Sequence, residues 1–331
     1  GTVSTAKPII ISNSGTSPLQ ISGLTIAGTH ATAFRLSNPP ALPFSIPAGQ
    51  RDTLHLQFTP SSTQTGTLSA ALNITSNDEN EAAASVGLYG LSANGEQGNN
   101  EPPLDAVVKT AGYAINVGGT NLVLSTSPNA IGDEILEPLF RKAGTGPVTI
   151  KAVARYSPDD PLAFGYYTKN NGAPVVTKVG TIALNGEQTL YPALTSDSRT
   201  SFDPGSAVFG FYTGATSYAR QNTYTEDHLN TGPLAHSVRI YSLKNRAGAP
   251  MPNSYLVAFE PASNGDYQDY VFEVTNIKPA TATSAPIRIN TGGPATMVSG
   301  VSWMGCAATG SCNGYVSGGI SYTQSPLPAI T

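Results

Sequence analysis

Apolar and polar residues alternate over short stretches of the chain, which is the pattern of half-buried β-strands. Leu54, Leu56 and Phe58 alternate with polar neighbours, and residues 68–74 repeat the alternation. Successive strand side chains point to opposite faces, so this period of two predicts strands with one face in a core. Turn residues recur roughly every ten positions over residues 1–95, which is typical of an immunoglobulin-like sandwich.

A second set of apolar runs predicts a larger, jelly-roll-like β-sandwich over residues 105–280. Its strands are expected at residues 113–117, 148–154, 163–167, 175–184, 207–212, 237–241, 255–259 and 270–274. One helix is predicted over residues 133–142, because four apolar positions there follow helical spacing and acidic residues precede basic ones. Pro138 lies inside this segment, so the helix is expected to be short or bent. The fold class predicted is therefore all-β, with tandem sandwiches.

Polar, Gly- and Pro-containing stretches divide the chain further. Residues 96–104 (GEQGNNEPP) have the composition of a linker between the two sandwiches. Residues 281–331 form a third, Gly-rich segment that is short for an independent core. Because the sequence starts at Gly1 with no secretion signal before it, we expect an internal or processed piece of a longer polypeptide.

The composition excludes some classes of protein. Charged residues make up 11% of the chain, against about 25% in a typical soluble domain. The net charge is −4, and no Lys/Arg cluster is available to neutralise phosphates, so we expect no nucleic-acid partner. No apolar run is long enough to span a membrane.

The two cysteines, Cys306 and Cys312, have five residues between them. This spacing allows a small disulfide loop, while the alternative is two unpaired thiols. A pair of this kind with no neighbouring histidine is a poor zinc site. We favour the disulfide, and with it a secreted, extracellular or cell-surface location.

Residues 1–95 resemble the ASH/hydin-type immunoglobulin-like domains. The resemblance rests on the strand that ends at residues 13–15 (NSG), the turn at 47–49 (PAG), residues 58–60 (FTP), 74–78 (ITSND) and 88–90 (LYG). It implies a spacer or interaction module of a bacterial surface or secreted protein. The usual opening strand is short or missing, so we predict that the sheet edge accepts the extended tail, residues 321–331, of a neighbouring copy.

Acidic residues gather between Glu260 and Glu273, in the run EPASNGDYQDYVFE. Asp266 and Asp269 lie three apart in a Gly-containing turn before a strand, and Glu260 lies close upstream. Crowded carboxylates repel one another unless they are well solvated or share a cation, and calcium prefers such oxygen ligands. The alternative is an ordinary hairpin, because Asn264-Gly265 is a strong turn signal and turn aspartates are usually only solvated.

The stretch from residue 209 to residue 274 resembles a β-domain of bacterial secreted and surface proteins. The matching pieces are residues 224–230 (YTEDHLN), 259–260 (FE) and 266–272 (DYQDYVF). The family's last motif is associated with calcium, so the resemblance implies a calcium site with Asp266, Asp269, Glu260 and a weaker fourth ligand, Asp227. Pro261 and Gln268 replace the usual Asp and Asn of the family pattern.

Residues 287–331 resemble the opening of a malectin-type carbohydrate-binding domain, through residues 287–293 (IRINTGG), Trp303 and residues 314–317 (GYVS). The resemblance implies a glycan partner, with Trp303, Tyr315 and Tyr322 offering flat faces to sugar rings. The competing interpretation is that these aromatic side chains pack in a core.

Signatures of common catalytic sites are missing from the sequence: it contains no H-E-x-x-H, G-x-S-x-G, phosphate-loop or dinucleotide motif. His228 and His236, which flank a loop near Asp227, are a weak zinc candidate. We therefore predict a non-catalytic extracellular structural or adhesive protein, such as a surface stalk or fibre subunit, with glycans or neighbouring copies as partners. The alternatives are an accessory carbohydrate-binding region of a larger glycoside-active enzyme and, less favoured, an enzyme in residues 105–280 with two facing carboxylates.

Overall fold

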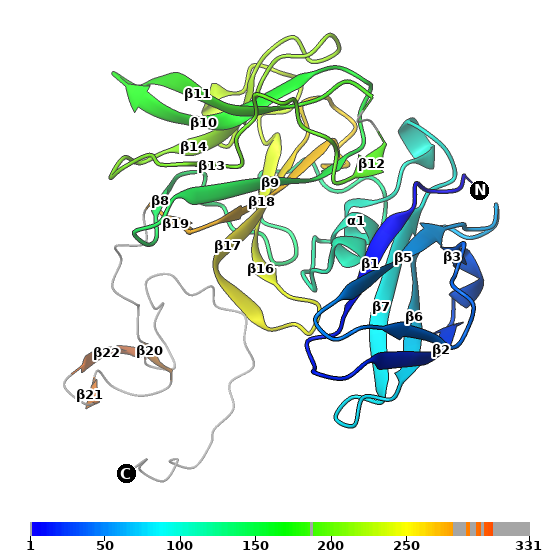
Figure 1. Ribbon diagram of the computed structural model, residues 1–331. Helices are drawn as coiled ribbons and strands as arrows, with labels where there is room; N and C mark the ends of the chain where they lie inside the picture. The colour runs from blue at the N-terminus through cyan, green and yellow to red at the C-terminus, as the bar shows by residue number, and fades with distance from the viewer. Residues whose placement is uncertain (1, 186–187, 281–288, 292–295, 299–300, 307–331) are drawn as a thin grey trace. The chain divides into compact units, whose positions relative to one another are not determined.

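The structure is a computed structural model that describes residues 2–185, 188–280, 289–291, 296–298 and 301–306. Residues 1–280 form one compact unit and residues 281–331 form another. The predicted all-β fold built from sandwiches is confirmed, since antiparallel strands dominate the first unit (Figure 1). The boundary between the two predicted sandwiches inside that unit stays a prediction.

The first sandwich packs two antiparallel sheets, with strand orders β1-β5-β3 and β4-β2-β6-β7. Its elements are β1 (Lys7–Ser12), β2 (Leu19–Ala27), η1 (Ala31–Ala33), β3 (Phe34–Ser37), β4 (Phe44–Ile46), β5 (Arg51–Phe58), β6 (Gly66–Ser76) and β7 (Ala83–Ser92). Leu54 of β5 packs against Ile21 and Leu72 of the other sheet, so the alternation read from the sequence places these residues in the shared core.

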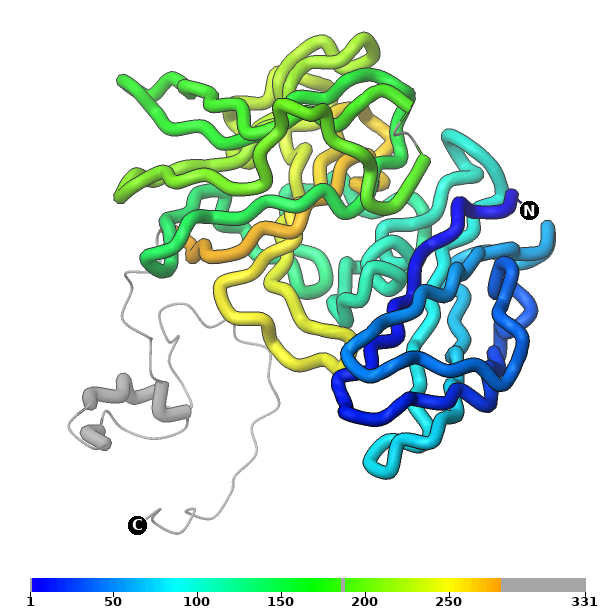
Figure 2. The backbone as a smooth tube through the Cα atoms, viewed as in Figure 1, coloured from blue at the N-terminus to red at the C-terminus, as the bar shows by residue number. Residues whose placement is uncertain are grey.

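The second sandwich is formed by the sheets β11-β10-β14-β15 and β12-β9-β18-β17-β16. Its strands are β9 (Val148–Arg155), β10 (Leu162–Asn170), β11 (Ala173–Ile182), β12 (Thr189–Leu190), β13 (Ser201–Phe202), β14 (Gly210–Thr213), β15 (Thr223–Tyr224), β16 (Val238–Lys244), β17 (Pro250–Phe259) and β18 (Tyr270–Thr275). Phe164 of β10 meets Phe272 of β18 with ring centroids 5.0 Å apart, in the core between the sheets. Strands distant in sequence lie side by side, as β9 and β18 do in Figure 2.

The central sheet, β12-β9-β18-β17-β16, is covered on its other face by the helix α1 (Leu104–Ala111), which follows η2 (Gly98–Asn100). Leu104, Val107 and Val108 of the helix are fully buried against residues of this sheet. Gly112 ends the helix in a left-handed conformation, with φ of 102°. Because both faces of the sheet are buried, its strands read as nearly continuous apolar runs.

The helix predicted over residues 133–142 is wrong. This segment is irregular and ends in a short strand, β8 (Phe140–Lys142), which pairs with β19 (Ile277–Pro279). The Phe140 N–H donates to the Phe209 carbonyl at 2.7 Å, so tertiary pairing takes a donor that a helix over 133–142 would use. Pro138 offers no N–H at all. The apolar residues of this segment therefore do not share one buried face: Phe140 is buried, whereas Leu136 is 54% exposed.

The strand predicted at residues 113–117 is reduced to a single bridge between Tyr113 and Asn245. The other strands expected between residues 148 and 274 are present, with shifted ends. In the second unit the structure describes three short strands, β20 (Ile289–Thr291), β21 (Thr296–Val298) and β22 (Val301–Cys306). β22 pairs in parallel with β20 and antiparallel with β21.

The first sandwich contacts the rest of its unit through α1. The Thr67 hydroxyl of β6 lies 2.8 Å from the Thr110 hydroxyl and donates to the Ala106 carbonyl at 3.1 Å. Arg246 donates to the last carbonyls of the helix, and its guanidinium lies 3.4 Å from the centre of the Tyr89 ring. Figure 1 shows α1 between the strands of the two sandwiches.

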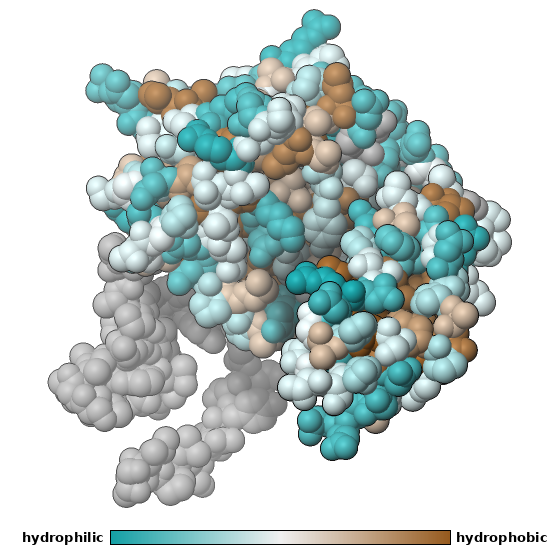
Figure 3. Space-filling view, in the orientation of Figure 1, coloured by the Kyte–Doolittle hydropathy of each residue, from teal (hydrophilic) through white to brown (hydrophobic). Residues whose placement is uncertain are grey.

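The face of the molecule drawn in Figure 3 is mostly polar or of intermediate hydropathy, and its apolar areas are small and separate. Within the described residues, no helix has the length and apolar character needed to cross a membrane.

Candidate metal centre

Three of the four acidic residues predicted from the sequence, Glu260, Asp266 and Asp269, lie in the loop that connects β17 to β18, two inner strands of the central sheet. Phe259 and Tyr270 pair across the two strands, so residues 260–269 close the loop between them. Inside the loop, Gly265 has φ of 78° and Tyr267 has φ of 55°. These left-handed residues turn the backbone sharply, so the loop is wider than a two-residue hairpin.

Glu260 organises the backbone of this loop. Its Oε2 accepts hydrogen bonds from the backbone N–H groups of Gly265, Asp266 and Tyr267, at 3.0, 2.9 and 3.4 Å. Its Oε1 accepts one more, from the Ala262 N–H at 3.0 Å. Consecutive N–H groups that point to one place form a nest that favours an anion. Glu260 thus fills a nest made by its own loop.

Asp266 and Asp269 bring two further carboxylates to the same place. One oxygen of Glu260, one of Asp266 and one of Asp269 lie within 4.8 Å of one another, and all three residues are buried. Within the described residues, none of these carboxylates has an ion pair with Lys, Arg or His. A buried Glu/Asp/Asp group of this kind can hold a metal ion.

Several oxygens at this place have no hydrogen-bond partner among the described residues, namely Asp266 Oδ1, Gln268 Oε1 and Asp269 Oδ2. The other Asp266 oxygen accepts from the side-chain amides of Asn264 and Gln268, at 2.6 and 3.1 Å. A buried polar atom without a partner costs about 1–3 kcal/mol, and more when it is charged. When the two carboxyl groups are ionised, all of these unpaired atoms are acceptors, so a cation would satisfy them together.

Burial and crowding also raise the pKa of two of these carboxyl groups. Burial, followed by the charge of Glu260, raises the pKa of Asp266 to about 8. Burial and the charges of Glu260 and Asp266 raise the pKa of Asp269 well above its ordinary value. In the protein alone, neutral pH therefore leaves protons on this group, and a bound cation would take their place.

The buried side chain of Glu101 reaches this group from the segment just before α1. Its Oε2 accepts from the Gln268 amide at 3.1 Å, and its Oε1 accepts from Gln188 at 2.6 Å. Because the Gln268 Nε2 is occupied by Glu101 and Asp266, the Gln268 Oε1 is the end left free. Neither Glu101 nor Gln268 was predicted from the sequence as a site residue, since Glu101 lay in the predicted linker.

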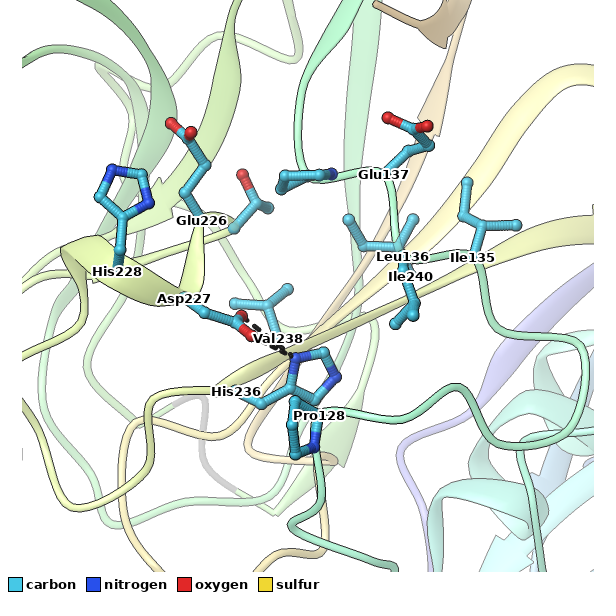
Figure 4. Close-up of a pocket in the computed structure, with 12 residues that line it drawn as sticks. Pro128, Ile135, Leu136, Glu137, Glu226, Asp227, His228, His236, Val238 and Ile240 are labelled. Atoms are coloured by element: carbon cyan, nitrogen blue, oxygen red, sulfur yellow. Dashed lines mark hydrogen bonds and ion pairs between the residues drawn. The ribbon is translucent and has the colours of Figure 1, made fainter. Parts of the chain in front are cut away.

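Asp227, the fourth predicted ligand, lies outside this group. It belongs to the short helix η3 (Asp227–Leu229), and both of its carboxylate oxygens lie near Nδ1 of His236, at 3.1 and 3.0 Å (Figure 4). The other ring nitrogen of His236 lies 3.0 Å from Glu134, which is also paired with Arg239. Asp227 is therefore part of a separate charged array.

The remaining predicted sites lie outside what the structure describes. Tyr315, Tyr322 and Cys312 fall among the residues that are not described, and the side chains of Trp303 and Cys306 are not described either. The disulfide, the glycan-contacting aromatic residues and the extended tail stay predictions.

No protein-family model and no curated protein matches the sequence. Solved structures that show some similarity include the secreted serine protease VesC from Vibrio cholerae, with 10% identity and a TM-score of 0.25, over 83% of this chain and 46% of the protease. The E. coli chaperone DraB has 11% identity and a TM-score of 0.24, over 66% of this chain and 88% of DraB. The chaperone YadV has 13% identity and a TM-score of 0.22, over 67% and 98%. The chain spans less than half of the protease, and TM-scores this low carry no argument about function.

Proposed function

We propose that this chain is a non-catalytic, extracellular structural or adhesive protein whose loop 260–269 is closed by a bound calcium ion. The observation that carries the proposal is the set of buried, unpaired oxygens on Asp266, Gln268 and Asp269. They belong to a loop whose backbone is already fixed by Glu260. Such a preorganised set of oxygens favours an ion that needs several ligands at once.

Calcium fits these ligands better than other common metals. The candidate ligand atoms are carboxylate oxygens and one side-chain amide oxygen, which are hard ligands. The group contains no His or Cys, so zinc and the softer transition metals lose their preferred ligands. Magnesium usually keeps several waters and binds one or two carboxylates, whereas calcium accepts six to eight oxygens in flexible geometry.

The position of the loop supports a structural role. β17 and β18 are neighbours in the central sheet, and the loop between them also contacts the segment before α1 through Gln268 and Glu101. A cation at this place would join the ends of β17 and β18 to that segment. Extracellular fluids hold calcium at higher concentration than the cytosol, in keeping with the weaker affinities of extracellular modules.

Thermal unfolding with and without calcium tests the proposal. Protein freed of metal with a chelator should melt at a lower temperature, and added calcium at 100 times the Kd should stabilise it by about 2.7 kcal/mol. Magnesium at the same concentration should act more weakly. The double variant Asp266→Asn/Asp269→Asn should lose the calcium response, while the control Asp52→Asn, an exposed carboxylate of β5, should keep it.

In the same experiment, Glu260→Gln separates the role of Glu260 in holding the loop backbone from its role as a ligand of the ion. Because Glu260 accepts four backbone hydrogen bonds, its loss should destabilise the protein even without calcium. A wild-type protein that melts at one temperature with chelator and with calcium would rule out the proposed ion. The proposed ion is equally excluded if the double variant responds to calcium as the wild type does.

Self-assembly is the part of the proposal that concerns partners. β1 is an end strand of its sheet in the described residues, and Ile10 on it is 56% exposed. Such an edge favours strand addition by another copy. Light scattering over a range of protein concentrations should show association, and deleting residues 321–331 should abolish it. A monomer at every concentration would exclude this mode of assembly.

A further inference from the structure

A cavity of about 360 Å³ lies beside the charged array of Asp227 and His236 (Figure 4). Apolar residues make up much of its lining, namely Pro128, Ile135, Leu136, Pro138, Val238 and Ile240. Its volume is within the range of small-ligand sites, which combine an apolar lining with a few polar groups. This cavity uses none of the oxygens assigned to the ion, so it is a separate candidate site.

Two of the acidic groups at the cavity already pair with basic side chains. Glu226 accepts from Lys169 at 2.6 Å and from the Tyr167 hydroxyl at 2.9 Å. Asp227 is paired with His236, whose other ring nitrogen binds Glu134. These contacts fix the polar side of the cavity, because Glu226 and His236 are both more than nine-tenths buried.

Glu137 is the acidic group of the lining that stays unbalanced. Among the described residues, no Lys, Arg or His lies within ion-pair distance of its carboxylate. Figure 4 shows Glu137 and Glu226 on opposite sides of the cavity. The Asp227 side chain also remains 41% exposed beside His236. The cavity therefore combines an apolar lining with an uncompensated negative charge.

We propose that this cavity binds a primary alkylammonium group, which is an amine carried on an aliphatic stem. The stem would pack against Leu136, Val238 and Ile240, and the ammonium would donate to the carboxylate of Glu137. A lysine side chain of a partner protein and a free aliphatic amine share this chemistry. An ammonium is a compact cation with three donors, so it can neutralise the Glu137 carboxylate and hydrogen-bond to it at the same time.

Other ligand classes fit less well. An anion would meet the charge of Glu137, and the basic groups Lys169 and His236 beside the cavity are already paired with carboxylates. A sugar ring would find no Trp, Tyr or Phe to stack on, since the lining contains none of them. A metal ion lacks a converging set of ligands here, because the metal-type group found in the described residues is Glu260, Asp266 and Asp269.

The test is an NMR titration of the full chain with three matched probes at pH 8: n-pentylamine, 1-pentanol and pentanoate. Pentylamine should shift the amide signals of residues 135–137 and 225–228 in a saturable way. Pentanol, which lacks the charge, should bind roughly tenfold more weakly, and pentanoate should not bind. Absence of saturable shifts with pentylamine, or equal binding of pentanol, would overturn the proposal.

Two variants test whether pentylamine binds in the cavity. Glu137→Gln should weaken pentylamine binding roughly tenfold, because it removes the uncompensated charge and keeps the shape. Glu81→Gln, an exposed carboxylate of the first sandwich, removes the same charge elsewhere and should leave binding unchanged. An equal loss of pentylamine binding in both variants would show that only the net charge matters, and would refute the site.

A second pair of probes identifies the source of the amine. A short peptide with one lysine that binds as tightly as pentylamine would support a protein partner. Binding of pentylamine without binding of the peptide would support a free amine. The calcium proposal can fail without affecting these results, because the titration reads residues around the cavity and can be run with chelator.

Discussion

The Tyr267 hydroxyl donates a hydrogen bond of 2.7 Å to the backbone carbonyl of His236, and so joins the acidic loop to the wall of the cavity. The ring of Tyr267 also lies under the guanidinium of Arg239, 4.6 Å from its centre. Arg239 in turn pairs with Glu134, which holds His236. The two candidate sites use different ligand atoms, but the contacts of Tyr267 and Arg239 link them.

Tyr267→Phe tests this connection. The variant removes one buried hydrogen bond and leaves the His236 carbonyl unpaired, so we expect a loss of about 1–2 kcal/mol in the free energy of unfolding. Urea unfolding measures it. Tyr212→Phe is the control, because the Tyr212 hydroxyl makes no hydrogen bond among the described residues. If both variants lose the same stability, the bond to His236 contributes nothing specific.

Glu101→Ala should weaken calcium binding although Glu101 is not expected to touch the ion. Without Glu101, the Gln268 amide nitrogen loses one of its two acceptors and keeps only Asp266, so the orientation that leaves Gln268 Oε1 free is less firmly held. Removing a residue that orients a metal ligand typically lowers affinity about 10–100-fold. Isothermal titration with calcium measures the change, and Glu96→Ala, an exposed acid in the same segment, is the control. An unchanged affinity in Glu101→Ala would show that Gln268 is held by other contacts.

The sequence predicted the features that depend on residues close together along the chain. Alternation along residues 54–58 identified β5, and the acidic residues of the loop were found because they lie within ten positions of one another. Glu101 was missed, because it meets Gln268 across 167 positions of the chain and its own surroundings read as a linker. No local pattern carries that contact.

The helices show how tertiary contacts override local spacing. Residues 133–142 have apolar residues at helical positions, yet Glu134 is drawn into pairs with Arg239 and His236, and Ile135 pairs with β16. The helix that does form, α1, carried its own signals, with Pro103 before it and Gly112 after it. Its apolar residues at 104, 107, 108 and 111 follow the same helical spacing, so the pattern was present in both segments, and packing together with the internal Pro138 decided between them.

The stability of the protein should fall as the pH rises above the ordinary pKa of histidine, because of His236. Burial opposes its charged form, but hydrogen bonds and charges of Glu134 and Asp227 outweigh that and raise the pKa of His236 above 6.5. Its contribution is fully present below pH 6.5 and is lost as the pH rises through the raised pKa. For one proton, the free energy of unfolding falls by at most about 1.4 kcal/mol per pH unit.

Urea unfolding between pH 6 and pH 9, with saturating calcium, measures this dependence. His236→Gln should flatten the fall in the free energy of unfolding, whereas His55→Gln, an exposed histidine of β5, should leave the slope as it is. If the two variants give curves of the same slope as the wild type, the charged pairs of His236 do not stabilise the fold.

Arg246→Ala should loosen the contact between the first sandwich and the rest of the unit. Arg246 donates to the Lys109 and Thr110 carbonyls at the end of α1 and lies over the Tyr89 ring of β7. A stacked guanidinium of this kind is worth about 0.5–2 kcal/mol, and its hydrogen bonds add to that. Because the bonds of Thr67 to α1 remain, the first sandwich should stay folded while its contact with α1 weakens.

Limited proteolysis detects this loosening as faster cleavage within residues 93–103, the segment between β7 and α1. Arg35→Ala serves as the control, because Arg35 lies on β3 and its side chain bonds only to Gln57 among the described residues. Calcium should slow the cleavage in the Arg246 variant, since Glu101 ties the same segment to Gln268 beside the proposed ion. Equal cleavage rates in wild type and Arg246→Ala would show that α1 and Thr67 hold the two sandwiches together without the arginine.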